Sequence, residues 1–458
     1  MVVFSSLEFI FRFFLIFIIV YFITPEKYRR ITLLIGSVIF YAVGEPVFIL
    51  VLVLSTLINF FWGKRIYDAC RMFQIRQWQE KKKKNILIQI VVFDAALLIL
   101  FKLLGVFVSS ELLPLGISFY IFKMISYQMD IYRGEISEQP SLMDTALYFT
   151  FFPQIVSGPI MRYEEGNLGY QPSLSWEKLE DGVKYFVIGL GLKVILADRL
   201  AILWNDIQMI GFDSISSPLA WLGAFSYSMQ LYFDFWGYSL MAAGIGVMLG
   251  YDFIQNFDHP YASRSIGEFY RRWHMTLGSW FRDYIYIPMG GSRCSKSRLC
   301  LNIMVVWAIT GLWHGSGLNY LIWGVILGLL ILLEKRVIGK YLKEIPVIGH
   351  LYVLLLIPLT WVIFAIEKLP QLGAYFGRLF PLIGGAGIAV NSQDIWNYLH
   401  TYGGLLFAGV ILCIPGVFGF YEKHKKNPIF AILLTGVFWY AVYYLVSSTG
   451  NPFMYFKF

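Results

Sequence analysis

The chain has 458 residues, of which 58% are hydrophobic and only 14% charged, and its mean hydropathy is +0.63. This composition excludes an ordinary soluble domain and indicates an integral membrane protein with several spans. The net charge of +8 fits the basic excess of cytoplasmic loops, and since no soluble stretch of domain size accompanies it, we expect no nucleic-acid partner.

The first half of the chain alternates apolar stretches with basic ones. Residues 7–24 form the first predicted span, and the Lys27, Arg29 and Arg30 that follow place its end in the cytoplasm and the N-terminus outside. The lysine-rich residues 64–85 are predicted as a basic cytoplasmic loop. Two later segments contain prolines and are predicted to be broken or re-entrant. In chain order, the predicted spans and broken segments are 7–24, 31–43, 48–62, 86–108, 112–132 and 143–159.

A polar insertion interrupts the second half of the chain. Residues 251–298 mix aromatic side chains with arginines, and we expect a cytoplasmic segment whose amphipathic helices lie among the lipid headgroups. The apolar segments before it are predicted to be separate and joined at residues 234–238. The glycine-rich residues 372–390 fit an amphipathic, interfacial or re-entrant segment. The other predicted helical segments are 176–204, 219–235, 239–249, 299–335, 345–366, 402–420 and 429–446.

Together these segments predict an all-α polytopic membrane protein with about 11 transmembrane or re-entrant helices, all in a single domain over residues 1–458. The cysteines are scattered and lack the paired spacing of metal ligands, so we expect neither a metal site nor a disulfide framework. They are Cys70, Cys294, Cys300 and Cys413.

An ionisable residue, His314, lies inside the long apolar stretch 299–335. A helix that begins at Leu299 carries the imidazole roughly 20 Å from the membrane surface, near the midplane, at about 1.5 Å per residue. A polar group at that depth needs solvation by protein or by a water-filled cavity, and it therefore marks a candidate functional site. Gly311, Gly315 and Gly317 allow another helix or a substrate to approach. The alternative is a histidine that only caps or hydrogen-bonds a neighbouring helix.

The acid–base properties of histidine suggest what His314 could do. Burial favours the neutral imidazole, which accepts a proton near neutral pH. The sequence has no nucleophile elbow, no phosphate-binding loop and no metal-ligand cluster around His314. An acceptor hydroxyl that loses its proton and attacks an activated acyl donor needs none of these. We therefore expect acyl transfer with His314 as the general base.

A second histidine, His274, lies in the aromatic run 273–284. It could meet a donor that enters from the cytoplasm, hydrogen-bond the donor's carbonyl group, or orient His314. Alternatively, it could only seat an amphipathic helix at the interface. The arginines around it could bind the phosphates of a nucleotide-bearing donor, although arginines that face anionic lipids would give the same pattern.

Several long phrases resemble the membrane-bound O-acyltransferase family, and specifically its bacterial alginate O-acetyltransferase branch. These phrases are residues 273–277, 280–288, 290–293 and 311–315, together with 3–6, 157–160, 232–239 and 451–458. The resemblance implies the fold of this family, with a central funnel or tunnel. It also implies that His314 is the essential histidine and His274 the second polar residue of the site. The remaining residues that we expect to contact substrate or donor are Tyr232, Asp234, Arg271, Arg272, Trp273, Trp280, Arg282, Asp283 and Trp313.

The same resemblance implies an activity. An acetyl group would pass from a cytoplasmic thioester to an extracellular polysaccharide or a cell-envelope glycan, and residues 286–293 favour acetyl-CoA as the donor. No permanently bound cofactor is expected. The implied partners are the thioester donor, membrane lipids, and an SGNH-type acetyltransferase or a glycan outside the cytoplasm. The implied location is the cytoplasmic (inner) membrane.

Other functions remain open at this point. One is D-alanyl transfer from a carrier-protein thioester to teichoic acid. Another is a transporter of glycan or lipid in which His314 relays protons, although the paired broken helices typical of transporters are not visible. A third is a non-catalytic scaffold for polysaccharide export.

Overall fold

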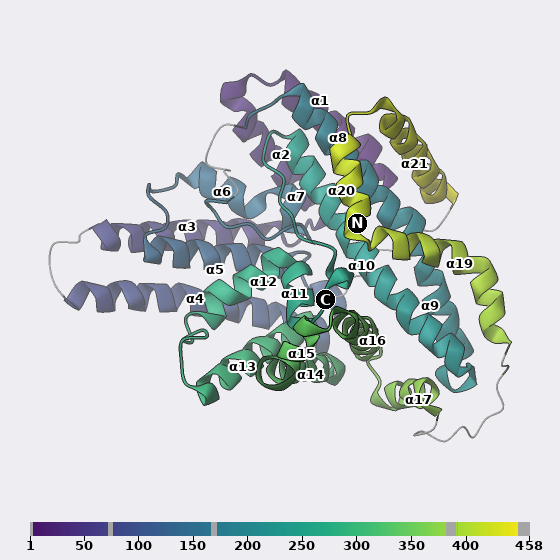
Figure 1. The fold of residues 1–458 in the computed structure, drawn as a ribbon. Coiled ribbons are helices and arrows are strands. Elements are labelled where there is room, and N and C mark those ends of the chain that lie inside the picture. The colour runs from purple at the N-terminus through teal and green to yellow at the C-terminus, as the bar shows by residue number, and fades with distance from the viewer. Residues whose placement is uncertain (1–2, 72–76, 166–171, 382–390, 392, 448–458) are drawn as a thin grey trace. The chain divides into compact units, whose positions relative to one another are not determined.

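The computed structural model describes residues 3–71, 77–165, 172–381, 391 and 393–447, and every regular element among them is helical (Figure 1). The all-α prediction is therefore confirmed for these residues. The C-terminal phrase 451–458 and most of the second half of the segment 372–390 lie outside the described residues. The helices up to the polar insertion are α1 (Leu15–Ile23), α2 (Arg29–Gly44), α3 (Ile49–Arg71), α4 (Gln77–Phe107), α5 (Ile117–Arg133), α6 (Leu142–Thr150), α7 (Phe152–Ile155), α8 (Trp176–Gly191), α9 (Asp198–Ile210) and α10 (Ser217–Met248).

Within the described residues, the polar insertion holds two short helices before α13 begins near its end, and most of the helices that follow are longer. They are α11 (Ile266–Arg272), α12 (Met275–Phe281), α13 (Lys296–His314), α14 (Leu318–Leu333), α15 (Gly339–Glu344), α16 (Pro346–Ala365), α17 (Leu369–Leu379), α19 (Asp394–Leu412), α20 (Pro415–His424) and α21 (Pro428–Ser447). Wider π-helical turns occur at Glu8–Phe14, Leu192–Ala197, Arg282–Tyr286 and Glu334–Ile338, and 3-10 turns at Glu26–Tyr28, Ser110–Leu112, Phe212–Ser214 and Pro260–Ala262.

The chain divides into two compact units. The first consists of Met1–Val187 with Tyr238–Ile254, and the second of Ile188–Gly237 with Gln255–Phe458. Helices α8 and α10 contribute to both units because the division falls within them. The polar insertion from Gln255 onward and both predicted histidines belong to the second unit. The single domain over residues 1–458 stays a prediction.

Several helices are long and apolar enough to cross a membrane. Within the described residues these are Ile49–Cys70, Lys81–Phe107, Pro346–Ala365 and Pro428–Ser447, and the pair Asp394–Leu412 and Pro415–His424, bent by 73°, adds a fifth if it forms one span. These helices make the chain a multi-pass membrane protein. The predicted total of about 11 crossing or re-entrant segments and the central tunnel stay predictions.

The basic stretch 64–85 is not the loop that the sequence predicted. Helix α3 runs on to Arg71 and α4 begins at Gln77, so most of the stretch is helical. Lysine, arginine, glutamine and glutamate are good helix formers, and a helix that continues beyond the apolar part of its span keeps its backbone hydrogen bonds while its charges meet water. The charge of the stretch therefore did not mark the end of the helix.

The predicted break at residues 234–238 is also wrong, because α10 is continuous over Ser217–Met248. Two features that suggested a break are accommodated inside the helix. Asp234 forms an ion pair with Lys193 at 2.8 Å, with both side chains almost fully buried. A Cβ at Gly237 would lie 2.6 Å from the carbonyl oxygen of Gly189, so this glycine permits close helix packing.

The first unit confirms two predictions of broken helices. Gly116 takes a left-handed backbone with φ of 72° directly before α5, so the segment 112–132 breaks at its start, and most of α5 is buried. The segment 143–159 divides into α6 and the short α7, which begins beside Pro153. Both proline-containing segments are thus interrupted, as the sequence analysis expected.

Candidate active site

The candidate site begins with a tight hairpin of α13 and α14 (Figure 1). A Cβ at Gly311 would overlap the carbonyl oxygen of Tyr320, and a Cβ at Gly324 would overlap that of Trp307. These pairings run in opposite directions along the two helices, so the helices are antiparallel and their backbones touch. Helix α13 ends at His314 and α14 begins at Leu318, which confirms the predicted glycine-lined break.

His314 is the last residue of α13 and is only 5% exposed. Aromatic rings stand edge to face around its imidazole, with centroid distances of 4.7 Å to Trp313, 5.3 Å to Trp323 and 5.1 Å to Phe364. Trp323 belongs to α14 and Phe364 to α16. Rings from three helices therefore fix the plane of the imidazole and shield it from water.

A wall of indole rings leads from His314 to the segment of the second histidine. Trp323 stacks on Trp361 at 5.7 Å, and Trp361 lies 5.0 Å from Trp273, the residue directly before His274. Trp273 also stacks on Phe269 of α11 at 5.5 Å. The two predicted histidines thus lie near opposite ends of one aromatic wall.

Backbone hydrogen bonds hold the turn between α11 and α12 against an earlier segment. The N–H of Asp258 donates to the carbonyl of Arg272 at 2.9 Å, and the N–H of Met275 donates to the carbonyl of Asn256 at 2.9 Å. Between these bonds His274 takes a left-handed backbone, with φ of 46° and ψ of 54°. Such a conformation is uncommon for a residue other than glycine, and flanking bonds of this kind are what maintain it.

The side chain of His274 is as buried as that of His314, with 3% exposed. Its Nδ1 lies 3.0 Å from Oδ1 of Asn256, and its ring meets Phe235 of α10 edge to face at 4.6 Å. Burial lowers the pKa of His274 to about 3. The imidazole is therefore neutral throughout the physiological pH range.

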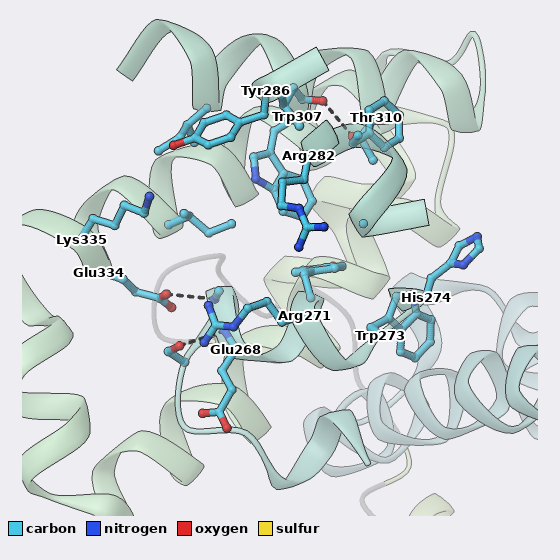
Figure 2. Close-up of a pocket in the computed structure, with 18 of the residues that line it drawn as sticks. Glu268, Arg271, Trp273, His274, Arg282, Tyr286, Trp307, Thr310, Glu334 and Lys335 are labelled. Carbon is cyan, nitrogen blue, oxygen red and sulfur yellow. Dashed lines mark hydrogen bonds between the residues drawn. The ribbon is translucent and has the colours of Figure 1, made fainter. Parts of the chain in front are cut away.

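Both histidines line one cavity of about 930 Å³ in the second unit. Its inner wall is aromatic, with Trp273, Trp307, Trp323 and Trp361, and its outer part is rich in charge. Figure 2 shows Arg282 pointing into the middle of the cavity, with Glu334 and Lys335 on one side and His274 on the opposite side. The charged residues that line it are the bases Arg264, Arg271, Arg282, Lys335, Lys340 and Lys343, all exposed, and the acids Glu268 and Glu334.

Glu334 organises the charged part of the cavity. It lies in the π-helical turn after α14 and is 8% exposed, and its carboxylate accepts hydrogen bonds from the backbone N–H groups of Ile266, at 2.5 Å, and Gly267, at 2.9 Å. These N–H groups open α11, so one carboxylate ties the start of α11 to the end of α14. Burial raises the pKa of Glu334, against the lowering effect of these two hydrogen bonds.

Five of the predicted site residues line the cavity: His274, His314, Trp273, Arg271 and Arg282. The other six do not. Arg272 pairs with Glu268 at 2.8 Å, Asp283 with Arg282 at 2.7 Å, and Asp234 with Lys193. Trp280 packs on Phe281 and Tyr284, Tyr232 stacks on Trp236 at 5.2 Å, and Trp313 lies beside the His314 ring. Their places in the structure support and orient neighbouring residues.

Sequence reasoning missed Asn256 and Glu334. Asn256 precedes His274 by 18 residues, and only the folded turn brings them together. No sequence spacing would have indicated that pair. Glu334 did leave a signal, because an acidic residue at the end of an apolar helix opposes the usual preference of helix C-termini for cations. Within the described residues, no group of three His, Cys, Asp or Glu side chains could hold a metal ion.

Comparison with known proteins gives this geometry its context. The chain is 36% identical to "Probable alginate O-acetylase AlgI" of Pseudomonas syringae, over 93% of this chain and 84% of that protein. It is 30% identical to "Peptidoglycan O-acetyltransferase" of Helicobacter pylori, over 75% of this chain and 72% of that protein. It is 31% identical to "Teichoic acid D-alanyltransferase" of Bacillus subtilis, over 46% of this chain and 56% of that protein.

A family model described as the membrane-bound O-acyltransferase family matches residues 47–343, a range that contains the break at His314, the turn at His274 and every basic residue of the cavity. That match covers well over half of the chain. The chain therefore belongs to the membrane-bound O-acyltransferase family.

Proposed function

We propose that this acyltransferase moves an acetyl group from acetyl-CoA on the cytoplasmic side of the membrane to a hydroxyl on the outer side, for O-acetylation of an extracellular polysaccharide or envelope glycan. The observation that carries the proposal is the cavity, which joins a basic outer part to a buried aromatic interior with a histidine at a helix break. Relatives named for O-acetylation of alginate and of peptidoglycan support the acetyl group.

His314 is the proposed general base. The acceptor hydroxyl gives its proton to the imidazole as its oxygen attacks the thioester carbonyl, and the new C–O bond forms. The C–S bond then breaks, and the imidazolium returns the proton to the departing thiolate. The edge-to-face rings of Trp313, Trp323 and Phe364 support this role because they hold the ring in one orientation.

The basic part of the cavity supports a donor with several phosphates. Six basic side chains stand against two acidic ones, and Glu334 is engaged with backbone N–H groups. Coenzyme A carries a diphosphate and a further ribose phosphate, whereas a carrier-bound pantetheine arm has a single phosphodiester. Arginines and lysines at an exposed cavity mouth suit the more highly charged donor.

The membrane arrangement follows from the same proposal. The chain would lie in the cytoplasmic membrane with its N-terminus outside and its basic cavity mouth in the cytoplasm. Its acceptor would be either an SGNH-type acetyltransferase, through a serine, or the glycan itself. No permanently bound cofactor takes part, since the acyl thioester arrives already activated.

The proposal is tested by acetate release from envelope polysaccharide of cells that carry the partner genes. His314→Ala should abolish ester-linked acetate at normal protein level, whereas His400→Ala, a matched change at an exposed position, should leave it unchanged. In proteoliposomes loaded inside with radiolabelled acetyl-CoA and supplied outside with the acceptor, the wild type should transfer label to the acceptor's hydroxyl with release of free thiol inside. Label transfer by His314→Ala, or transfer from a D-alanyl carrier thioester in preference to acetyl-CoA, would overturn the proposal. Glycan movement without thiol release would indicate a transporter.

A further inference from the structure

The hydrogen bonds of Asn256 determine which ring nitrogen of His274 carries the proton. Oδ1 of Asn256 lies 3.0 Å from His274 Nδ1 and also accepts from the backbone N–H of Thr276, at 3.3 Å, and from its hydroxyl, at 2.9 Å. The backbone N–H can only donate, so the atom that it meets is the carbonyl oxygen of the amide. A carbonyl oxygen can only accept, so His274 Nδ1 is the protonated nitrogen.

The other ring nitrogen then has a lone pair and no proton. Nε2 of His274 is buried and has no hydrogen-bond partner among the described residues. With the pKa lowered to about 3 by burial, the ring stays neutral and this lone pair persists at physiological pH. A buried acceptor without a partner is uncommon in folded proteins and indicates a group that binds a water or a substrate.

The tautomer decides which substrate group can meet Nε2. A neutral Nε2 cannot donate to the carbonyl oxygen of a thioester, which removes one of the roles considered for His274 above. It can only accept from an O–H or N–H group. The hydroxyl that reacts gives its single proton to His314, so the group that meets Nε2 of His274 is a different O–H or N–H group of a bound substrate.

We propose that Asn256 is a positioning residue that fixes His274 in the Nδ1–H tautomer, so that Nε2 accepts a hydrogen bond from an O–H or N–H group of a bound substrate, distinct from the hydroxyl that reacts at His314. This inference rests on the proposed function for the identity of that substrate, but the tautomer itself does not depend on it. The left-handed backbone of His274 and the Met275 N–H bond to the Asn256 carbonyl keep the two side chains in register. The ring contact with Phe235 fixes the imidazole plane.

Three variants test the proposal through their pH profiles of acetyl transfer. Asn256→Asp keeps an acceptor for Nδ1–H but adds a negative charge, which raises the pKa of His274. Its activity should approach the wild-type rate at alkaline pH and fall as the pH drops through the new pKa, because the imidazolium has no lone pair at Nε2. Asn256→Ala should lower the rate about tenfold or more at every pH, since one ring hydrogen bond is lost. Asn302→Ala removes another buried asparagine, which bonds the Gly291 carbonyl, and should keep the wild-type profile shape.

A second readout is independent of turnover. The chain has six histidines, and solid-state NMR of ¹⁵N-histidine-labelled protein, with His274→Gln to assign the resonances, reports which nitrogen of His274 is protonated. We expect a protonated Nδ1 in the wild type and a mixture of tautomers in Asn256→Ala. A wild-type Nε2–H, or an Asn256→Asp profile superimposable on the wild type, would overturn the inference. If the wild type transfers no acetyl group at all, the proposed function fails, and the NMR result still decides the tautomer.

Discussion

The hairpin of α13 and α14 allows a sharp test of how the site is positioned. Gly311 lies one helical turn before His314, and a Cβ at this position would overlap the carbonyl oxygen of Tyr320 and stand 3.1 Å from its carbonyl carbon. The obstacle is backbone, so no rotamer change relieves it. Gly311→Ala should therefore push the last turn of α13 away from α14 by about 1 Å, at a cost of about 1–3 kcal/mol for overpacking.

Such a displacement moves His314 relative to Trp323 and Phe364. A misplacement of about 1 Å can lower a rate on the order of 100-fold, so Gly311→Ala should lose far more activity than stability. The assay is the rate of acetyl transfer in proteoliposomes beside the thermal unfolding midpoint. Gly328→Ala should be milder, because its Cβ would meet the flexible Met304 sulfur at 2.9 Å.

The matched control is Gly436→Ala in α21. Nothing lies within 4 Å of a Cβ at Gly436, and alanine is the better helix former by about 1 kcal/mol, so this variant should be as active as the wild type and equally or more stable. A Gly311→Ala protein with the wild-type rate would refute the reasoning, because it would show that His314 tolerates movement of its helix. Equal losses in Gly311→Ala and Gly436→Ala would point to a general effect of alanine and refute it as well.

Three further predictions use charge. The pKa of His274 in the folded protein, about 3, lies below its ordinary value of 6.5, so between pH 3 and pH 6.5 the unfolded chain binds a proton that the folded protein does not. The free energy of unfolding should therefore fall by about 1.4 kcal/mol per pH unit as the pH drops through this range. His274→Gln should make the free energy of unfolding less dependent on pH in the same range. A triple variant should replace the lysines at the cavity mouth, Lys335, Lys340 and Lys343, with glutamine. It should have a higher KM for acetyl-CoA, a KM that depends less on salt, and a kcat that changes little. Lys368→Gln is the control. Asp234→Asn should lower the free energy of unfolding by about 1.5–3 kcal/mol, because it removes one of the two carboxylates that pair with the buried Lys193 ammonium. Lys193→Met removes the cation that Asp234 and Asp198 share, and it should cost more, about 3–5 kcal/mol.

The membrane class, the helical fold and the cavity residue His314 could be predicted from the sequence because each depends on local pattern. Apolar length indicates a span, a glycine-rich interruption indicates a helix end, and an ionisable residue within an apolar run indicates a site. The break at His314 is of this kind, since Gly315 and Gly317 follow it directly. The family phrases added His274, whose local sequence does not distinguish a site residue from an interfacial one.

The errors came from interactions between distant segments. Asp234 and Gly237 suggested a break in α10, but the ion pair with Lys193 and the close approach of Gly189 keep the helix continuous. Trp280 and Asp283 belong to a family phrase, yet they support α12 and Arg282 and do not line the cavity. A family phrase contains residues that the packing of the fold requires as well as residues that the reaction requires. Membership in such a phrase therefore does not show that a residue lies in the cavity.

The same argument explains why Asn256 and Glu334 matter although no pattern marks them. Each is a polar side chain that fixes another segment far along the chain: Asn256 orients His274, and Glu334 holds the first N–H groups of α11. Together they hold α11 and the turn after it at both ends: Glu334 binds the start of α11, and Asn256 binds the turn at His274. Since Trp273 and Arg271 lie within that stretch, the geometry of the cavity depends on these two residues as much as on those that line it.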